Sequence, residues 1–512
     1  MWACGCPRTI IDVLTQLGLC PSFPSIHNTL ETLSKSALKA TIAAISGQGV
    51  AWLNGYDNLN ASTSIHAAQQ YLGSRPKVEN FTARTVYIAK NSTKDAMDAA
   101  VFDAHSRNAP TVTLGDLRPS LESIARIQHQ YAAQIVEILL ASGPFLSLTS
   151  QRASIIDYRD VRRPTTHEKT IQFPLTVVEI DESTIEGNRE NLEEMMQLLE
   201  FTPEQASELK IPTSGDQMTC SRIRSSAEER EADRSPYHRG TVWVPIPGGF
   251  HVMLNWLRMM LKVYRGSPAD NGALARYIDV LDLKRLRNSE PDHFLLERLI
   301  REVYYGHVLA CWVEVSGFPT LEAFRASKPS HETLRRLAVS IVDKFIGAPS
   351  EASFLSDDQD PASTDETFRS ACLFNRDAAI YFEMKSATKR GDFGRIEDLL
   401  PLLVCGFRGG GCTKYAHEML HLLQNLKYSW LQPFANMVRD NFFVNTTGRP
   451  LGYKEMDKNQ EHAIRTYKVR IPNWHSRLYV VLSAHIHSFY WQLEACMQIQ
   501  AISRPWARCG TF

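Results

Sequence analysis

The feature that most constrains the fold of this chain is a change of pattern near residue 251. Before that point, short runs of β-branched and aromatic residues alternate with segments of helical spacing, and after it the spacing is almost wholly helical. Strand-like runs are found at Val50–Tyr56, Thr82–Ala89, Thr111–Leu114, Leu209–Ser214 and Val242–Ile246, with a further extended segment at residues 171–180. Strands followed by a helical half are typical of α/β and α+β proteins.

The order of the elements narrows the fold further. Helices are predicted at residues 119–140, 188–199 and 219–233, so that strands and helices alternate as in a ribonuclease H-like core with helical insertions. We therefore predict an α/β (α+β) protein with a mixed sheet, a large helical insertion and a helical C-terminal half. The predicted parts are an N-terminal helical segment (1–49), the core (50–250), the insertion (251–346), a flexible acidic linker (347–366) and a helical region that completes the core (367–512).

Charge and composition limit the classes of partner. The chain has 512 residues, of which 44% are hydrophobic and 22% charged, as in ordinary soluble proteins of two or three domains. Its 56 basic and 56 acidic residues cancel, which argues against strong non-specific polyanion binding by the whole molecule. Local basic faces remain open, at Lys284, Arg285 and Arg287 and at Arg152, Arg159, Arg162 and Arg163.

The sequence predicts an intracellular protein, cytoplasmic or nuclear. Its ten cysteines are scattered without a Cys-x-x-Cys pair, which favours reduced thiols over disulfides. The N-terminus lacks the pattern of a signal peptide. No uninterrupted apolar run reaches the roughly 20 residues of a membrane span, so no membrane partner is expected.

Two aspartates follow strand-like runs and are candidate metal ligands. Asp57 lies in Tyr56-Asp57-Asn58, and Asp216 lies in Gly215-Asp216-Gln217. Mg²⁺ is commonly held by one or two carboxylates together with water and substrate oxygens, so a carboxylate at a strand end suits it. Each aspartate also has a structural alternative, a turn at Asp57 and a helix cap at Asp216.

Further residues would complete such a site. Arg222 and Arg224 follow Asp216 within two helical turns and are suited to phosphate. His251 follows two glycines at a predicted helix start, where it is a metal neighbour, a proton shuttle or a structural residue.

The third acid of the hypothetical site is Glu461 or Glu383, each on a predicted helix. Together with Asp57 and Asp216 it would hold two Mg²⁺ or Mn²⁺ ions about 4 Å apart for in-line attack on a phosphodiester.

A different metal site is suggested by His417-Glu418-Met419-Leu420-His421, which matches the His-Glu-x-x-His zinc motif. On a helix, His417 and His421 share one face, Glu418 would polarise a zinc-bound water, and Asp440 is a conceivable third ligand. Such short matches also arise by chance in long chains, and we expect zinc less than Mg²⁺.

Several motifs resemble one family. They are Tyr56-Asp57-Asn58-Leu59-Asn60, Gly215-Asp216-Gln217 with Arg222-Ile223-Arg224, Pro247-Gly248-Gly249-Phe250-His251, Gly391-Asp392-Phe393-Gly394-Arg395, Asn445-Thr446-Thr447-Gly448-Arg449-Pro450 and Gln460-Glu461-His462. Spanning roughly residues 50–470 in consistent order, they resemble a large fungal family, domain of unknown function 6589. The resemblance implies a fungal source, and the expansion of such families resembles that of transposons.

The resemblance bears on both metal hypotheses. Asp57, Asp216 and Glu461 all lie within the family motifs, which is expected if they form an acidic triad that is active or was active in an ancestor. The family pattern at Tyr415-Ala416-His417-Glu418 is Tyr-Ala-x-Glu, without the histidines, which lowers the expectation of a zinc site. No DNA-binding module of the kind found in intact transposases is evident near the N-terminus, so a decayed or domesticated copy is expected.

Three functions are therefore open. The first is a transposase-derived, ribonuclease H-like nuclease or strand-transferase that acts on DNA through an Asp/Asp/Glu triad. The second is a non-catalytic interaction or scaffold protein on the same fold. The third is a zinc hydrolase that uses His417, Glu418 and His421.

Overall fold

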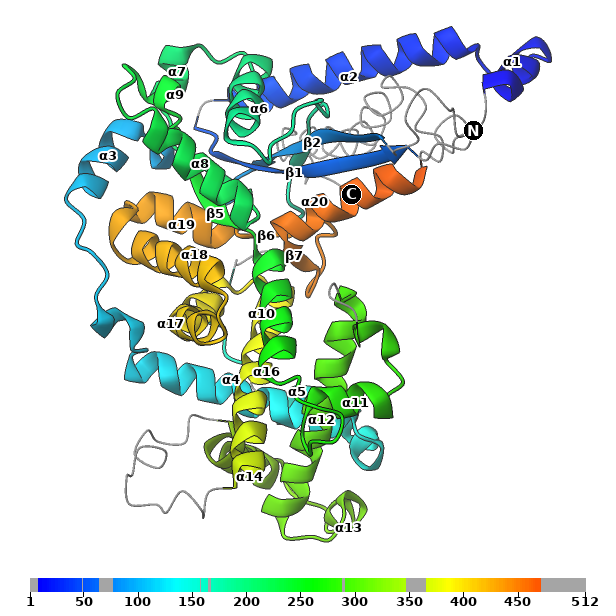
Figure 1. Ribbon diagram of the computed structural model, residues 1–512, viewed down its shortest axis with the longest axis vertical. Coiled ribbons are helices and arrows are strands. Elements are labelled where there is room, and N and C mark those ends of the chain that lie inside the picture. Colours follow the sequence, from blue (N-terminus) through cyan, green and yellow to red (C-terminus); the bar gives the residue numbers. More distant parts are fainter. Residues whose placement is uncertain are drawn as a thin grey trace, which may run out of the picture. The chain divides into compact units, whose positions relative to one another are not determined.

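The computed structural model describes residues 8–47, 49–63, 77–156, 158–163, 167–287, 291–346 and 365–470 (Figure 1). The chain divides into two compact units that alternate along the sequence. The first unit comprises residues 1–110, 166–251 and 425–512, and the second comprises residues 111–165 and 252–424. Most of the predicted linker, at residues 347–364, and the end of the predicted C-terminal helical region, at residues 471–512, lie outside the described residues.

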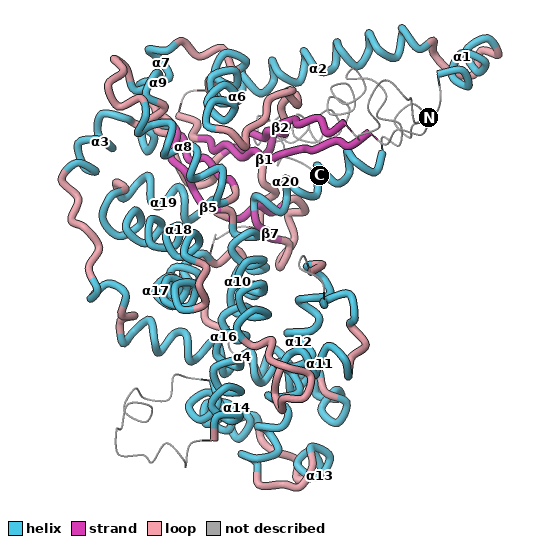
Figure 2. The backbone as a smooth tube through the Cα atoms, viewed as in Figure 1, coloured by secondary structure: helices cyan, strands magenta, loops and turns pink. Residues whose placement is uncertain are grey.

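The first unit contains a mixed sheet of five described strands in the order β3-β2-β1-β4-β5 (Figure 2). The strands are β1 (Trp52–Thr63), β2 (Lys77–Ile88), β3 (Gln172–Pro174), β4 (Ile211–Gly215) and β5 (Trp243–Pro247). The pairs β1–β2 and β2–β3 are antiparallel, whereas β1–β4 and β4–β5 are parallel. This confirms the prediction of an α+β protein with a mixed sheet.

Helices precede and follow the strands of this unit. They are α1 (Arg8–Gln16), α2 (Phe23–Ile45), α3 (Ala99–Arg107), α6 (Ile185–Leu198), α7 (Pro203–Ser207), α8 (Gln217–Glu229), α9 (Pro236–Arg239), α19 (Gln432–Asn441) and α20 (Met456–Arg470), with short turns η2 (Lys94–Met97) and η8 (Asn425–Ser429). The predicted helices at residues 188–199 and 219–233 correspond to α6 and α8, with boundaries shifted by a few residues.

The two faces of β1 pack against different helices, because successive side chains of a strand point to opposite sides. Leu59 packs in one apolar cluster with Ile464 of α20, and Leu53 packs in another with Met456. On the other face, the hydroxyl of Tyr56 donates a hydrogen bond to α6. In Figure 1, α20 (orange) accordingly runs beside the blue β1–β2 hairpin.

Two details of the fold differ from the sequence prediction. Residues 111–114 form no strand, since Asp116 Oδ2 accepts hydrogen bonds from the amide and hydroxyl of Thr113 (2.6 and 2.8 Å), which closes the turn η3 (Leu114–Leu117). The third strand is β3, within the extended segment at 171–180. A hairpin that was not predicted, β6 (Phe443–Asn445) and β7 (Tyr453–Glu455), leads directly into α20.

The described part of the second unit is helical. Its elements are α4 (Leu121–Ala141), η4 (Gly143–Gln151), α5 (Arg152–Ile155), most of α10 (Gly249–Val263), α11 (Leu274–Val280), η5 (Lys284–Arg287), α12 (His293–Ser316), α13 (Leu321–Ala326), α14 (His331–Ile341), η6 (Val342–Ile346), α16 (Glu366–Arg390), α17 (Phe393–Gly409) and α18 (Thr413–Gln424). The buried Trp256 of α10 stacks edge-on against Phe407 and donates a hydrogen bond to the carbonyl of Asp377 (2.9 Å).

No single described helix has both the length and the apolar character to cross a membrane, although the bent pair Leu114–Ala141 and Gly143–Ile155 meets that criterion by length and composition. The cysteines that lie in the described ranges are free thiols, in line with the expectation of reduced cysteines.

Candidate functional site

Asp57 and Asp216 come from neighbouring parallel strands of the first unit. β1 pairs with β4 through Asn54–Thr213 and Gly55–Ser214. One step of two residues along each strand brings Asp57 level with Asp216, which directly follows β4. The negative charge of Asp216 is one of the lesser causes that raise the pKa of Asp57, as expected for two acids at the same level of adjacent strands.

Asp57 lies in an unfavourable place for a charged group. It has the parity of Leu59 on β1 and therefore faces the α20 side of the sheet. Its Oδ1 accepts a hydrogen bond from the amide of Asn58 (2.8 Å), but its buried Oδ2 has no hydrogen-bond partner among the described residues. Burial raises the pKa of Asp57 to about 8, with a further rise from Glu461 and an opposing effect of His251.

Asp216 has the structural role that the sequence offered as an alternative. It is the N-cap of α8, and its Oδ1 accepts a hydrogen bond from the amide of Thr219 (2.7 Å). The cap involves one carboxylate oxygen, so capping and ligand binding are compatible at this residue.

The N-terminus of α10 is held by an acid from α20 that sequence analysis missed. Asp457 accepts hydrogen bonds from the amides of Phe250 (3.0 Å) and His251 (2.9 Å) and from His251 Nδ1 (3.0 Å). The approach is close enough that a Cβ at Gly248 would lie 2.3 Å from Asp457 Oδ2, so only glycine fits there. Asp457 thus supplies negative charge at a helix N-terminus, where it is stabilising.

His251 is held as a cation between acids. Burial alone would lower the pKa of His251, but the hydrogen bond and charge of Asp457, with smaller effects of Asp57 and Asp216, raise it to about 9. In turn, burial would raise the pKa of Asp457, yet its contacts with His251 lower it below the usual value. His251 is therefore protonated at neutral pH, and its role includes fixing the start of α10.

Glu461 lies one helical turn after Asp457 on the same face of α20. Its Oε1 is 3.9 Å from His251 Nε2, and its side chain is 42% exposed, against 4% for Asp457. The exposed fraction matters because a carboxylate open to solvent can exchange water for a ligand. Of the two acids in this turn, Glu461 is therefore the one that is available to bind.

Glu182 is a second acid that the sequence did not single out. It is 2% exposed, and the hydroxyl of Thr219 lies 3.5 Å from its Oε2. Burial, together with the charges of Asp57 and Asp216, raises the pKa of Glu182 well above its usual value. In the sequence it appears within a polar helix-start segment, where no pattern marks it as part of a site.

The two predicted phosphate-binding arginines lie on α8. Arg222 donates from Nε to the carbonyl of Ser183 (3.0 Å), which fixes the loop that carries Glu182. Arg222 and Arg224 are both partly buried. The contact of Arg222 is structural, and substrate binding by either arginine stays a prediction.

Glu383 belongs to the second unit. Its carboxylate, 1% exposed, receives two hydrogen bonds from Arg395, at 2.6 and 2.7 Å. This bidentate buried pair occupies both carboxylate oxygens of Glu383. Of the two glutamates proposed as the third acid, Glu461 is the one that the fold of the first unit brings near Asp57.

The zinc motif lies on α18, but its side chains diverge. His417 and His421 are exposed, whereas Glu418 is buried with the apolar face of the helix. Asp440 lies on α19, in the first unit. A zinc hydrolase needs its two histidines and its glutamate at one metal-bound water, so this arrangement gives the zinc hypothesis no support.

The acids of the first unit fit a hard divalent cation held by few ligands. Within the described ranges, no group of three or more histidine, cysteine, aspartate or glutamate side chains forms a closed metal-binding set. Mg²⁺ and Mn²⁺ do not require one, because Mg²⁺ is usually bound by one or two carboxylates plus water and substrate oxygens. The orphaned Oδ2 of Asp57 is the acceptor atom that such an ion would satisfy.

Residues 106–495 match a family described as a family of unknown function (DUF6589). The chain belongs to this family. The match includes Asp216, His251 and Glu461 but begins after Asp57, so the resemblance predicted from about residue 50 is confirmed only from residue 106 onward. No curated protein matches the chain.

Proposed function

We propose that the first unit is a ribonuclease H-like core that uses Mg²⁺ or Mn²⁺ to cut or join phosphodiester bonds of DNA. In this proposal Asp57, Asp216 and Glu461 are the metal ligands, and this DUF6589 protein descends from a fungal transposase.

The observation that carries the proposal is the sheet of the first unit. Three antiparallel strands followed by two parallel ones, in the order β3-β2-β1-β4-β5, set a carboxylate of β1 level with one that follows β4. A later helix, α20, brings Glu461 close enough to raise the pKa of Asp57. Two aspartates on adjacent strands and an acid from a later helix are the ligands expected of a ribonuclease H-like metal site, and this arrangement supports the proposal.

Each residue has a distinct task in this proposal. Asp57 would give its orphaned Oδ2 to the cation, and Asp216 would give the oxygen that does not cap α8. Glu461, half exposed, would complete the set from α20. Protonated His251, whose Nδ1 is held by Asp457, directs Nε2 toward Glu461 and limits the repulsion among the carboxylates.

The cation itself, when bound, would activate the attacking water or 3′-hydroxyl and stabilise the charge that develops on the phosphate. The protein's contribution is to exclude water around Asp57 and to fix the carboxylates on rigid strands, which lowers the cost of organising the site.

Asp216→Asn tests this function cleanly, because asparagine is as good an N-cap as aspartate and leaves α8 intact. We expect the natural chain to cleave labelled DNA in Mn²⁺ and the variant to lose at least a hundredfold in rate, with an unchanged melting temperature in EDTA. Glu228→Gln, an exposed acid on the same helix, is the control for loss of one charge. Equal cleavage by the natural chain and Asp216→Asn would overturn the assignment.

A metal-binding measurement separates an inactive descendant from a wrong site. Mn²⁺ should raise the melting temperature of the natural chain and of Glu228→Gln but not of Asp216→Asn. Stabilisation without cleavage would indicate a site that has kept its metal and lost its chemistry. Absence of both would favour the alternative, a non-catalytic interaction protein on this fold.

A further inference from the structure

We propose that four cationic residues of the second unit form a contact surface for the phosphate backbone of double-stranded DNA. This surface, here called the basic patch, consists of Arg258, Lys262, Arg408 and Lys414. It lies around the turn between α17 and α18. The basic patch shares its class of partner with the proposed function but uses neither the carboxylates nor the metal ion of the first unit.

The second half of α10 packs closely against the end of α17 and the turn that follows it. A Cβ at Gly406 would lie 2.3 Å from the ring of Trp256, and one at Gly410 would lie 2.2 Å from the side chain of Met259. One turn later, Lys262 Nζ donates a hydrogen bond to the carbonyl of Gly410 (3.3 Å). Glycine is therefore needed at these two positions, and α10 and the turn form one continuous surface.

This packing brings the four cations of the basic patch to the same part of the unit. Arg258 and Lys262 are four residues apart on α10 and so lie on one face of that helix. Arg408 lies in the last turn of α17, and Lys414 lies in the first turn of α18. All four side chains are exposed. Burial raises the pKa of the Cys412 thiol, and the positive charge of Lys262 opposes this rise, which places that charge beside the turn.

The positive charge of the basic patch is not neutralised by acids. Among the residues that the structure describes, none of the four forms an ion pair, and the contact of the Lys262 ammonium is with a backbone carbonyl. The sequence explains this, because residues 252–269 and 399–417 contain no aspartate or glutamate. The four exposed cations are therefore available to an external anion.

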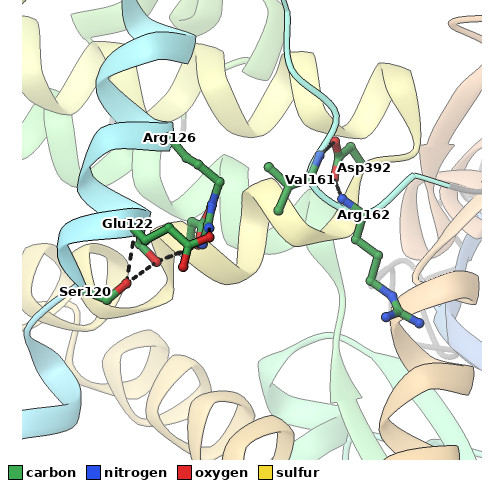
Figure 3. Close-up of polar contacts among 8 residues, drawn as sticks. Ser120, Glu122, Arg126, Val161, Arg162 and Asp392 are labelled. Atoms are coloured by element: carbon green, nitrogen blue, oxygen red, sulfur yellow. Dashed lines mark hydrogen bonds and ion pairs between the residues drawn. The ribbon is translucent and has the colours of Figure 1, made fainter.

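Other cations of the second unit are paired with acids. Arg126 of α4 forms ion pairs with Glu122 and with Asp398, each at 2.6 Å (Figure 3). The basic clusters named from the sequence also contain paired members, which are Arg152, Arg163 and Lys284. The basic patch differs from these clusters in that its charge is unopposed.

Double-stranded DNA suits the basic patch better than an acidic peptide does. A duplex presents a phosphate charge about every 1.7 Å of its axis, whereas an extended peptide presents at most one side chain about every 3.3 Å. Several exposed cations can therefore contact a duplex at once. The turn Gly409–Gly411 has no side chains that would keep a phosphate backbone away, and the positive end of the α18 dipole attracts phosphate.

The test is fluorescence anisotropy with a labelled duplex in EDTA, across a range of NaCl concentrations. For Arg258→Gln/Lys262→Gln we expect affinity to fall at least tenfold near 0.1 M salt. The slope of log affinity against log salt should fall by about 2, roughly 0.9 for each lost phosphate contact. The matched control is Arg298→Gln/Arg336→Gln, which removes two exposed cations from other helices of the same unit.

A charge added at the turn tests the place of binding. A Cβ at Gly409 would meet no atom within 4 Å, so a side chain fits there without strain. We expect Gly409→Asp to bind the duplex severalfold more weakly than Gly409→Asn, because the two side chains have the same size and differ by one negative charge. Melting temperatures check that all variants are folded. Equal affinities of these two variants, or equal losses in the two double variants, would overturn the proposal.

The choice of partner is tested with labelled poly-glutamate in the same assay. We expect it to bind at least tenfold more weakly than the duplex, and equal affinity would reject DNA as the partner of the basic patch. A natural chain that does not bind the duplex would reject it as well.

The two proposals fail separately. Binding in EDTA does not involve the metal site, so Asp216→Asn should bind the duplex as the natural chain does. Loss of cleavage with retained binding concerns the metal site alone. Unchanged affinity of Arg258→Gln/Lys262→Gln in a chain that cleaves DNA in Mn²⁺ would reject the basic patch alone.

Discussion

Asp57 shows how the fold holds a single carboxyl group against its preference for water. An aspartate that is ionised in the unfolded chain and protonated in the folded one reduces stability as pH rises between the two pKa values. For Asp57 this window runs from about 4 to about 8, since burial and Glu461 raise its pKa to about 8. Residues at functional sites commonly carry such a cost, because the same burial strengthens binding of a cation.

We predict that Asp57→Asn stabilises the metal-free protein, and that its advantage grows with pH. Below about pH 4 both forms are neutral in either state, so the variant has little effect. Between pH 4 and pH 8 the natural chain loses up to roughly 1.4 kcal/mol per pH unit relative to the variant. Urea unfolding in EDTA at pH 5 and pH 8 measures this, with Glu228→Gln as the flat reference. A difference that does not change with pH would contradict the assigned environment.

At the scale of elements, α10 and α20 are joined by Asp457. The first amides of a helix have no partner within it, and α10 receives its acceptor from the first turn of α20 rather than from the residues just before it. Contacts of this kind explain why an acid far along the chain belongs to the site. They also distinguish the role of Asp457, which accepts hydrogen bonds from the first amides of α10, from that of Glu461, which lies one turn away on the same helix.

Substitution of these two acids should change the free energy of unfolding by very different amounts. Asp457→Ala leaves the α10 amides and His251 without their acceptor, which we expect to cost on the order of 3 kcal/mol. Glu461→Gln should change stability by at most about 1 kcal/mol, because the side chain is half exposed and its loss relieves Asp57. Unfolding in EDTA compares them, and Asp457→Asn, which keeps an oxygen acceptor, should fall between. Equal effects would remove the distinction drawn here.

At the scale of the whole molecule, two compact units alternate along one chain. The first unit is assembled from three separate stretches, so β5 and α20 complete one fold although residues 252–424 come between them. The buried pair Glu383–Arg395 lies in the second unit, whereas the carboxylate site is contained in the first. A disturbance in one unit should therefore have local consequences.

Glu383→Gln tests this division. Breaking a buried ion pair by neutralising one partner costs on the order of 3 kcal/mol, since Arg395 is then left buried without its counter-charge. Amide hydrogen exchange should accelerate in α16 and α17, while β1 and β4 keep their protection. In Mn²⁺ the variant should keep any metal-induced stabilisation of the first unit. Loss of that stabilisation would instead restore Glu383 as a candidate ligand.

The sequence by itself determined the class and order of elements, because these depend on local spacing. Period-2 and helical patterns predict the strand that carries Asp57, the strand before Asp216 and the helices α4, α6 and α8. The His-Glu-x-x-His match was also found from spacing. Spacing alone does not predict that Glu418 is buried with the apolar face of α18 while His417 and His421 are exposed.

Only the tertiary structure decided which acids meet. Asp457 and Glu182 lie in unremarkable polar segments, and their importance comes from burial beside residues hundreds of positions or several elements away. The same holds for Glu383, whose carboxylate is taken up in a buried pair with Arg395 within the second unit. Charge, burial and hydrogen bonding at a site depend on long-range packing, and a pattern read along one chain contains no measure of it.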